Sequence, residues 1–131
     1  MTEEPTAQAP GNRTVLVLDD EDTLRKMVRR VLELYDYTVL EAAHAQAALE
    51  AVTEHEGPID LILCDLVLPG LGGREAASAL MARRPEAKVL YMSGYSSPGS
   101  FRSDLEHTAP DFLPKPFEVQ QLLDAIEKAL G

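Results

Sequence analysis

The sequence predicts an α/β protein whose single parallel β-sheet is covered by helices on both faces. Two observations carry this prediction. Five short apolar runs recur along the chain and are nearly continuous, as in strands that are buried on both faces. The segments between these runs repeat apolar residues at helical spacing, and alternating strands and helices are typical of parallel sheets. A chain of 131 residues has the length of one domain.

The first apolar run covers residues 14–18 and predicts a buried strand. Before it, residues 1–13 contain Pro, Gly and small polar residues without apolar periodicity. We therefore expect a disordered tail or linker there, and a single domain over residues 14–131. After the strand, apolar residues at i, i+3, i+4, i+7 and i+8 predict the first helix; they are Leu24, Met27, Val28, Val31 and Leu32.

The second and third strands are predicted on either side of a weaker helical stripe. Residues 38–40 form the second strand, and the apolar run over residues 59–64 forms the third. The helix between them ends before Gly57-Pro58, and its stripe consists of Ala45, Ala48, Leu49 and Val52. Residues 66–73 carry one proline and three glycines, so they predict a loop.

The rest of the chain predicts two more strands, at residues 89–92 and 112–114. The helix before the first of these has the apolar stripe Ala76, Ala77, Leu80 and Met81. Between the two strands, Phe101 and Leu105 are the main apolar anchors, and we expect a short helix from about residue 97 to 106. The last helix has the stripe Val119, Leu122, Leu123, Ile126 and Leu130.

The expected strand order is 2-1-3-4-5, the flavodoxin-like doubly wound arrangement with five helices and a switch point between strands one and three. Ligands bind such sheets in the crevice outside the carboxyl ends of the strands. Four strands of this chain end there in reactive side chains, which are Asp19-Asp20, Asp65, Ser93 and Lys115. Three carboxylates, a hydroxyl and an ammonium around one point suit a divalent cation and a phosphoryl group.

The composition disfavours nucleic-acid and membrane partners. The chain has 12 Lys and Arg against 22 Asp and Glu, and the resulting net charge of -10 would repel a phosphate backbone. No apolar stretch approaches the roughly 20 residues that span a bilayer. The single cysteine, Cys64, can form no internal disulfide, which fits a reducing compartment, and we expect a cytoplasmic location.

Four motifs, in this order, resemble those of receiver domains of two-component response regulators, which are CheY-like proteins. They are Leu-Asp-Asp-Glu-Asp at 18–22, Cys-Asp-Leu-Val-Leu-Pro-Gly at 64–70, Met-Ser-Gly-Tyr at 92–95 and Phe-Leu-Pro-Lys-Pro-Phe at 112–117. The resemblance covers about residues 14–130. The last two motifs look like those of receivers attached to hybrid histidine kinases. A stand-alone regulator and a receiver from a longer kinase both stay open.

The resemblance implies a phosphoacceptor and a metal site. Asp65 would accept the phosphoryl group, and Asp19, Asp20, Asp65 and the backbone carbonyl of Val67 would hold Mg²⁺. Elementary electrostatics agrees with this assignment. Clustered carboxylates raise one another's pKa unless a cation is present, and Mg²⁺ prefers oxygen ligands.

The resemblance also implies how the phosphoryl group is held and sensed. Ser93 would contact it and Lys115 would pair with it. The Lys115–Pro116 bond is expected to be cis, although most bonds before proline are trans. Phe112 matches the aromatic residue that moves when the strand-four loop closes on the phosphoryl group. Val67 and Tyr95 would border the path of attacking water, which predicts slow self-dephosphorylation.

The implied partner is the phosphohistidine of a sensor histidine kinase or of a histidine phosphotransfer domain. The chain would then be a signalling domain that catalyses its own phosphorylation and dephosphorylation, not an enzyme with a separate substrate. A monomer and a dimer that forms on phosphorylation both stay open. Leu24 could belong either to the core or to the surface that docks the partner.

Three other classes compete with this interpretation. A phosphohydrolase of the haloacid dehalogenase type would need an acidic residue two positions after its nucleophile, where this chain has Val67, and a cap domain for which there is no room. A flavin- or nucleotide-binding module would need a phosphate-cradling loop in place of the acidic residues 19–22. A degenerate receiver that only binds partners would lack a key residue, and none of the expected ones is missing.

Single residues also have simpler explanations. Asp19 and Asp20 could merely favour the start of the first helix, because acidic groups are stabilising at helix N-termini. The joint pattern of four strand ends disfavours that explanation. By contrast, Cys64 is expected to be strand filling, and the helical stripes are expected to belong to the core. Solvated charges rather than metal ligands are expected at Glu21, Asp22 and Glu41.

Overall fold

The computed structural model describes residues 13–68, 70, 72–93 and 112–131. Its elements, in chain order, are β1 (Thr14–Leu18), α2 (Asp22–Leu34), β2 (Thr38–Ala42), α3 (Ala45–Glu54), β3 (Leu61–Asp65), α4 (Gly73–Arg83), β4 (Lys88–Ser93), β5 (Phe112–Pro114) and α6 (Val119–Leu130). The predicted tail, the loop residues 69 and 71, and the helix expected at 97–106 lie wholly or almost wholly outside the described residues.

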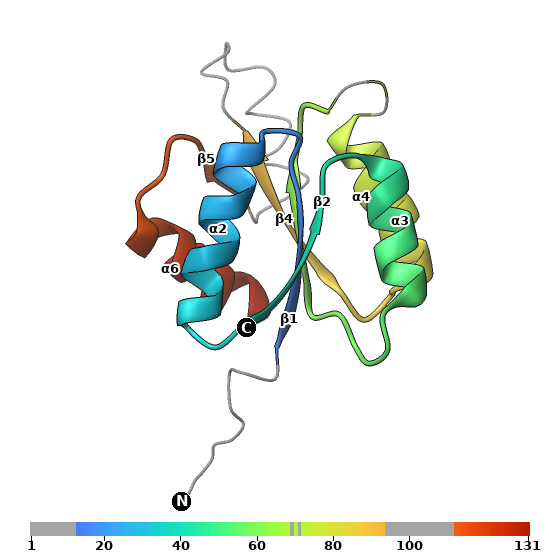
Figure 1. Cartoon of the computed structure of the whole chain (residues 1–131), viewed down its shortest axis with the longest axis horizontal. Coiled ribbons are helices and arrows are strands. Elements are labelled where there is room, and N and C mark those ends of the chain that lie inside the picture. The colour runs from blue at the N-terminus through green and yellow to red at the C-terminus, as the bar shows by residue number, and fades with distance from the viewer. Residues whose placement is uncertain (1–12, 69, 71, 94–111) are drawn as a thin grey trace, which may run out of the picture.

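The five strands form one parallel sheet in the order β2-β1-β3-β4-β5. Helices α2 and α6 cover one face of this sheet, and α3 and α4 cover the other (Figure 1). The predicted flavodoxin-like topology is therefore confirmed, with four helices in the described part of the chain. None of the described helices combines the length and apolar character needed to cross a membrane.

The strands at the centre of the sheet are buried on both faces. Along β1, Val15 and Val17 pack toward α2 and α6, whereas Leu16 and Leu18 pack toward α3 and α4. All five residues of β3 are buried as well. Each such aliphatic side chain contributes about 1.5–3 kcal/mol when it is removed from water, so the two-sided burial explains why these strands are apolar throughout.

The helical stripes predicted from the sequence are buried for the most part, but three of their residues are exposed. Met27, Met81 and Val119 have exposed fractions of 38%, 40% and 45%. Val119 is the first residue of α6, where the chain only begins to approach the sheet. Met27 lines an open groove, so assigning every residue of these stripes to the core was wrong.

Helix α4 begins in direct contact with the end of β3. The Gly73 N–H donates to the Leu66 carbonyl over 2.9 Å. A Cβ at Gly73 would overlap the carbonyl oxygen of Asp65 and would lie 2.6 Å from the Leu66 Cα. The thiol of Cys64 lies 3.5 Å from the carbonyl oxygens of Asp65 and Gly73, and burial raises its pKa to about 12. Only glycine, which has no Cβ, lets the start of α4 come this close to the backbone of Asp65 and Leu66.

The first prediction concerns this contact. Gly73→Ala should lower the free energy of unfolding by about 1–3 kcal/mol, because the added methyl group must push apart backbone atoms that have no room to move. Urea unfolding followed by circular dichroism measures the change.

Gly72→Ala is the matched control. Its Cβ would meet only the Glu75 side chain, whose Oε1 lies 2.5 Å away and can swing aside. This variant should cost less than about 1 kcal/mol. Equal losses in the two variants would contradict the steric argument.

Candidate functional site

The topology brings the chemically active strand ends to one edge of the sheet. Asp19 and Asp20 follow β1 and Asp65 is the last residue of β3, which is the neighbouring strand. One carboxylate oxygen from each of the three lies within 4.8 Å of the others. Asp19 and Asp65 are buried, whereas Asp20 is exposed. The cluster that the sequence predicted is therefore present, with one side open to solvent.

Lys115 supplies a positive charge to this cluster. Its Nζ lies 2.9 Å from Asp19 Oδ2 and 3.3 Å from Asp65 Oδ2, and only 13% of its side chain is exposed. The Lys115 N–H donates to the Ser93 carbonyl over 2.7 Å. The Lys115–Pro116 bond is cis, as expected. Lys115 thus bridges two carboxylates from adjacent strands.

Backbone N–H groups hold the other oxygens of the same two carboxylates. The Glu21 N–H donates to Asp19 Oδ1 over 2.8 Å, and the Val67 N–H donates to Asp65 Oδ1 over 3.2 Å. Each carboxylate is therefore fixed at one oxygen by its own loop and at the other by Lys115. Val67 contacts the cluster through its backbone N–H, whereas 44% of the residue is exposed.

The electrostatics of the cluster favour uptake of a cation. Burial raises the pKa of Asp65 and the charge of Asp19 raises it further; Lys115 and the Val67 N–H oppose this shift without cancelling it. Burial by itself would lower the pKa of Lys115, but Asp19 and Asp65 raise it overall, so the ammonium stays charged. Three carboxylates face one ammonium, and a second positive charge would relieve the remaining repulsion.

The donor set fits Mg²⁺. Its members are carboxylate oxygens, the ligands of hard divalent cations, and no histidine or thiolate belongs to the group of described residues. The exposed side at Asp20 leaves room for the water ligands that Mg²⁺ usually retains. A phosphoryl group could approach from the same side.

Ser93 lies on β4, the strand next to Asp65, and Phe112 lies on β5, one strand further along the sheet. Ser93 ends β4 and is 2% exposed, one residue beyond Met92, which pairs with Asp65. Phe112 opens β5 opposite Tyr91 and is partly buried. The predicted contact residue therefore lies at the same sheet edge as the cluster. Tyr95 and the loop that contains it fall outside the part of the chain that the structure describes.

Glu41 differs from its expected role as a solvated charge. Its side chain is only 18% exposed and lies 2.9 Å from Arg25 Nε and 2.7 Å from Arg29 Nη1. No sequence pattern pointed to Arg25, which is buried and contacts the acidic loop through the Asp19 carbonyl and Asp22. Arg25 and Glu41 are 16 residues apart, so helical spacing within one element gives no signal for this pair.

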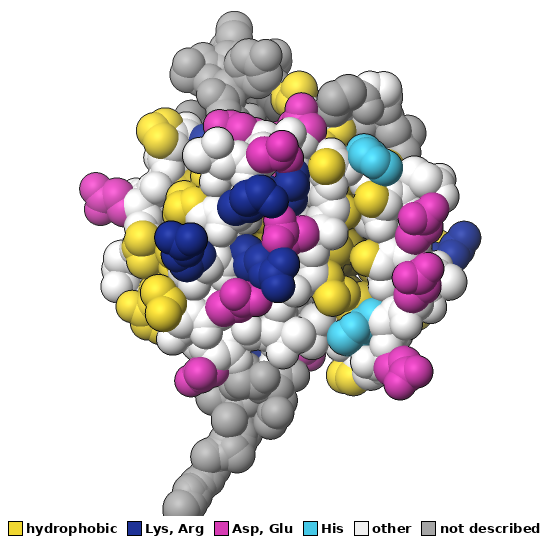
Figure 2. Space-filling model, viewed as in Figure 1, with side chains coloured by type: hydrophobic (Ala, Val, Ile, Leu, Met, Phe, Trp, Pro, Cys, Tyr) yellow, Lys and Arg dark blue, Asp and Glu magenta, His cyan; other side chains and the backbone are white. Residues whose placement is uncertain are grey.

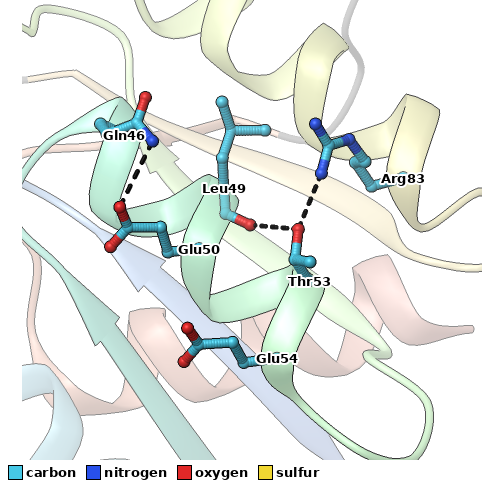
Figure 3. A pocket seen from close by; sticks show the side chains of 6 residues that line it. All are labelled: Gln46, Leu49, Glu50, Thr53, Glu54 and Arg83. Carbon is cyan, nitrogen blue, oxygen red and sulfur yellow. Dashed lines mark hydrogen bonds between the residues drawn. The ribbon is translucent and has the colours of Figure 1, made fainter.

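Among the described residues, one hollow lies away from the carboxylate cluster and another lies at its border. The first, of about 240 Å³, lies between α3 and α4, where Arg83 donates to the Thr53 hydroxyl and where Glu50 and Glu54 also line the wall (Figure 3). Its glutamates would repel a phosphoryl group. The other, of about 410 Å³, adjoins the cluster and is lined by Glu21, Leu24, Met27, Lys115, Pro116 and Phe117.

Leu24 has two different environments in the structure. It packs against the core on the α2 and α6 side of the sheet, and it lines the groove beside Lys115. The groove is mostly apolar at this point, since Met27 and Phe117 form its other walls.

Comparison with known proteins places this geometry in context. Residues 15–127 match the family model of the response regulator receiver domain. The chain is 34% identical over 127 residues to the sensor kinase CckA of Brucella abortus, covering 97% of this chain and 13% of that protein. It is also 34% identical over 116 residues to the chemotaxis protein CheY of Listeria monocytogenes, covering 88% of this chain and 96% of that protein.

Solved structures agree with the sequence relatives. The response regulator TrrA from Thermotoga maritima, solved in complex with Mg²⁺-BeF, has a TM-score of 0.74 and 28% identity, covering 90% of this chain and 99% of that one. The chemotaxis protein CheY4 of Vibrio cholerae has a TM-score of 0.77 and 27% identity, covering 90% and 98%.

The second prediction follows from the raised pKa of Asp65. In metal-free solution at pH 7, Asp65→Asn should raise the free energy of unfolding by roughly 1 kcal/mol, because it removes a buried carboxylate that Asp19 repels while Lys115 keeps Asp19. Urea unfolding in a chelator measures this change.

The pH dependence has a definite sign. The folded pKa of Asp65 lies above its unfolded value, so ionised Asp65 destabilises the fold at neutral pH, and this penalty disappears as pH falls through the folded pKa. The advantage of Asp65→Asn should therefore shrink on acidification. Asp124→Asn, at an exposed position of α6, serves as the control. A stability loss in Asp65→Asn that does not vary with pH would contradict the argument.

Proposed function

Because the chain belongs to the response regulator receiver domain family of two-component signalling, we propose that Asp65 accepts a phosphoryl group with Mg²⁺ bound beside it. Asp19, Asp20, Asp65 and the Val67 carbonyl would hold the metal. The observation that carries the proposal is the Lys115 ammonium, which reaches both Asp19 and Asp65 inside a cluster of three carboxylates. A structural ion pair would need only one of them.

In the proposed reaction, Asp65 is the nucleophile. A carboxylate oxygen forms a bond to phosphorus while the bond from phosphorus to the donor's imidazole nitrogen breaks, and the product is an acyl phosphate on Asp65. When bound, Mg²⁺ would supply positive charge that neutralises the carboxylates and offsets the negative charge of the phosphoryl group. The N–H of Val67 keeps the Asp65 carboxylate in one orientation for attack.

Lys115 and Ser93 would stabilise the charge on the transferred group. The Lys115 ammonium already lies 3.3 Å from the reacting carboxylate and can pair with a phosphoryl oxygen while Asp19 retains it. Ser93, at the end of β4, would donate its hydroxyl to another oxygen. Phe112 would report the change by moving with the loop after β4. That loop and the expected helix at 97–106 lie beyond the residues described.

The proposed donor is the phosphohistidine of a sensor histidine kinase or of a histidine phosphotransfer domain. The groove formed by Leu24, Met27 and Phe117 supports this choice, because it gives a donor protein an apolar surface next to Lys115. The chain spans 13% of the sensor kinase CckA and 96% of CheY, so relatives exist both as part of a kinase and as a single domain.

The remaining parts of the proposal concern the chain as a whole. Residues 14–131 would form the receiver and residues 1–13 a tail or linker. The domain would catalyse its own phosphorylation and dephosphorylation, and a dimer of phosphorylated chains is one state in which it could signal. Cys64 is a free buried thiol, in keeping with the reducing cytoplasm in which we propose that the domain acts.

The third prediction tests the phosphoacceptor. Incubation with Mg²⁺ and acetyl phosphate should add one acid-labile phosphoryl group to the wild-type chain, because the carboxylate cluster and Lys115 activate Asp65. Intact-mass spectrometry detects the addition. Asp65→Asn should lose it, whereas Asp60→Asn, before β3 at the opposite edge of the sheet, should retain it. Modification of the Asp65→Asn chain at the wild-type rate would refute the assignment.

The fourth prediction concerns the lifetime of the acyl phosphate. Val67→Asn should speed its hydrolysis by several-fold to about tenfold, since an amide at this half-exposed position can orient a water that valine cannot. Val67→Ile is the apolar control and should leave the rate unchanged. Phosphate release from the purified phosphoprotein measures both. If the two variants lose phosphate equally fast, the side chain of Val67 does not govern water access.

A further inference from the structure

Arg25 is a buried cation placed behind the acidic end of β1. It is 7% exposed, although arginine is rarely buried without partners. Its Nη1 donates to the Asp19 carbonyl over 2.9 Å, its Nε to Glu41 Oε1 over 2.9 Å and its Nη2 to Asp22 Oδ1 over 2.7 Å. One guanidinium therefore joins the end of β1, the first turn of α2 and strand β2.

The contact with the Asp19 carbonyl has a consequence for the carboxylates. This carbonyl belongs to the peptide unit that links Asp19 to Asp20, so Arg25 fixes the plane of that unit. The Asp19 N–H is tied as well, because it donates to the Ala42 carbonyl over 3.1 Å. With its backbone held on both sides, the Asp19–Asp20 segment has little freedom to turn its side chains away from Asp65.

Glu41 offsets the cost of burying the charge of Arg25. Burial by itself would raise the pKa of Glu41, but its hydrogen bonds with Arg29 and Arg25 lower it overall, so the carboxylate stays charged. Arg29 reaches Glu41 Oε2 from the surface over 2.7 Å and also pairs with Glu33. Basic and acidic side chains are interleaved over α2 and β2 on this face of the molecule (Figure 2).

We propose that Arg25 is a positioning residue for the metal site: through the Asp19 carbonyl it holds the Asp19 and Asp20 carboxylates in the arrangement that a divalent cation requires. This inference rests on the proposed function, because it concerns the same metal site. Arg25 touches neither the carboxylate of Asp19 nor that of Asp65 in any hydrogen bond of the described residues. It acts through the backbone.

Simple electrostatics makes the opposite prediction, and this separates the two effects. A guanidinium near the cluster repels an incoming cation, so its loss should tighten Mg²⁺ binding. Loss of positioning should weaken Mg²⁺ binding, because the carboxylates would have to be ordered at the expense of binding energy. The sign of the change in affinity therefore identifies which role Arg25 has.

Arg29 provides a matched control. Arg29→Gln removes the same charge and also takes one ion pair from Glu41, but Arg29 does not contact the Asp19 carbonyl. Arg25→Gln removes both the charge and the carbonyl contact. Arg25→Lys keeps the charge, but a single ammonium cannot reproduce the three-way fork of the guanidinium.

The test is the Mg²⁺ dissociation constant of each chain, measured by calorimetry without any phosphodonor, with thermal unfolding in a chelator as the check on folding. Arg25→Gln should weaken binding by roughly tenfold or more, the usual effect of removing a group that orients a metal ligand. Arg25→Lys should weaken it less. Arg29→Gln should stay within about twofold of wild type or bind more tightly.

The outcomes are distinguishable. Tighter binding by Arg25→Gln, or equal shifts in Arg25→Gln and Arg29→Gln, would overturn the positioning role while leaving the metal site intact. If Arg25→Gln does not fold in the chelator, Arg25→Lys decides the question: wild-type affinity in that variant overturns the inference. A wild-type chain without saturable Mg²⁺ binding would overturn the proposed metal site, and this inference with it.

Discussion

The structure depends on how one ammonium, that of Lys115, balances the two buried carboxylates of Asp19 and Asp65. Lys115 Nζ lies 2.9 Å from Asp19 and 3.3 Å from Asp65, and without it two like charges would share a desolvated edge of the sheet. The balance is incomplete, because burial and Asp19 still raise the pKa of Asp65. The site is therefore stable enough to fold and still gains from a further cation or from a change in the charge of Asp65. A signalling domain that responds to phosphorylation needs a site whose stability changes when its charge changes.

The fold makes this charge balance possible because it places the backbones of the charged residues at one edge of the sheet. Parallel strands bring Asp19, Asp65 and Lys115 to one edge even though up to 96 residues separate them in the chain. Close packing then fixes the peptide units of the residues that carry these carboxylates. Gly73 allows α4 to begin against the carbonyl of Asp65, and Arg25 holds the carbonyl of Asp19. The same strand ends are thus supported from both sides of the sheet.

The sequence predicted the parts of this account that local pattern controls. Strand order and the candidate site followed from apolar runs that end in Asp19, Asp65 and Lys115, because the carboxyl ends of parallel strands meet at one edge. The ion pair of Arg25 with Glu41 was missed, since it joins a helix to a strand and has no periodic signature. Gly73 was assigned only to a loop, because the contact that requires glycine exists only after α4 packs on β3. Helical periodicity does not distinguish a buried residue from one at the border of an apolar stripe. Met27 was therefore predicted to lie in the core, whereas 38% of it is exposed.

The central claim is that Asp65 carries an uncompensated charge that a cation relieves. The most direct measurement is the pKa of Asp65 itself, followed by NMR of its carboxyl carbon in the wild-type chain, first in a chelator and then with saturating Mg²⁺. We expect a pKa above the ordinary aspartate value of about 3.9 in the chelator and a clear fall in this pKa when Mg²⁺ is added. An ordinary pKa that is the same with and without Mg²⁺ would contradict it.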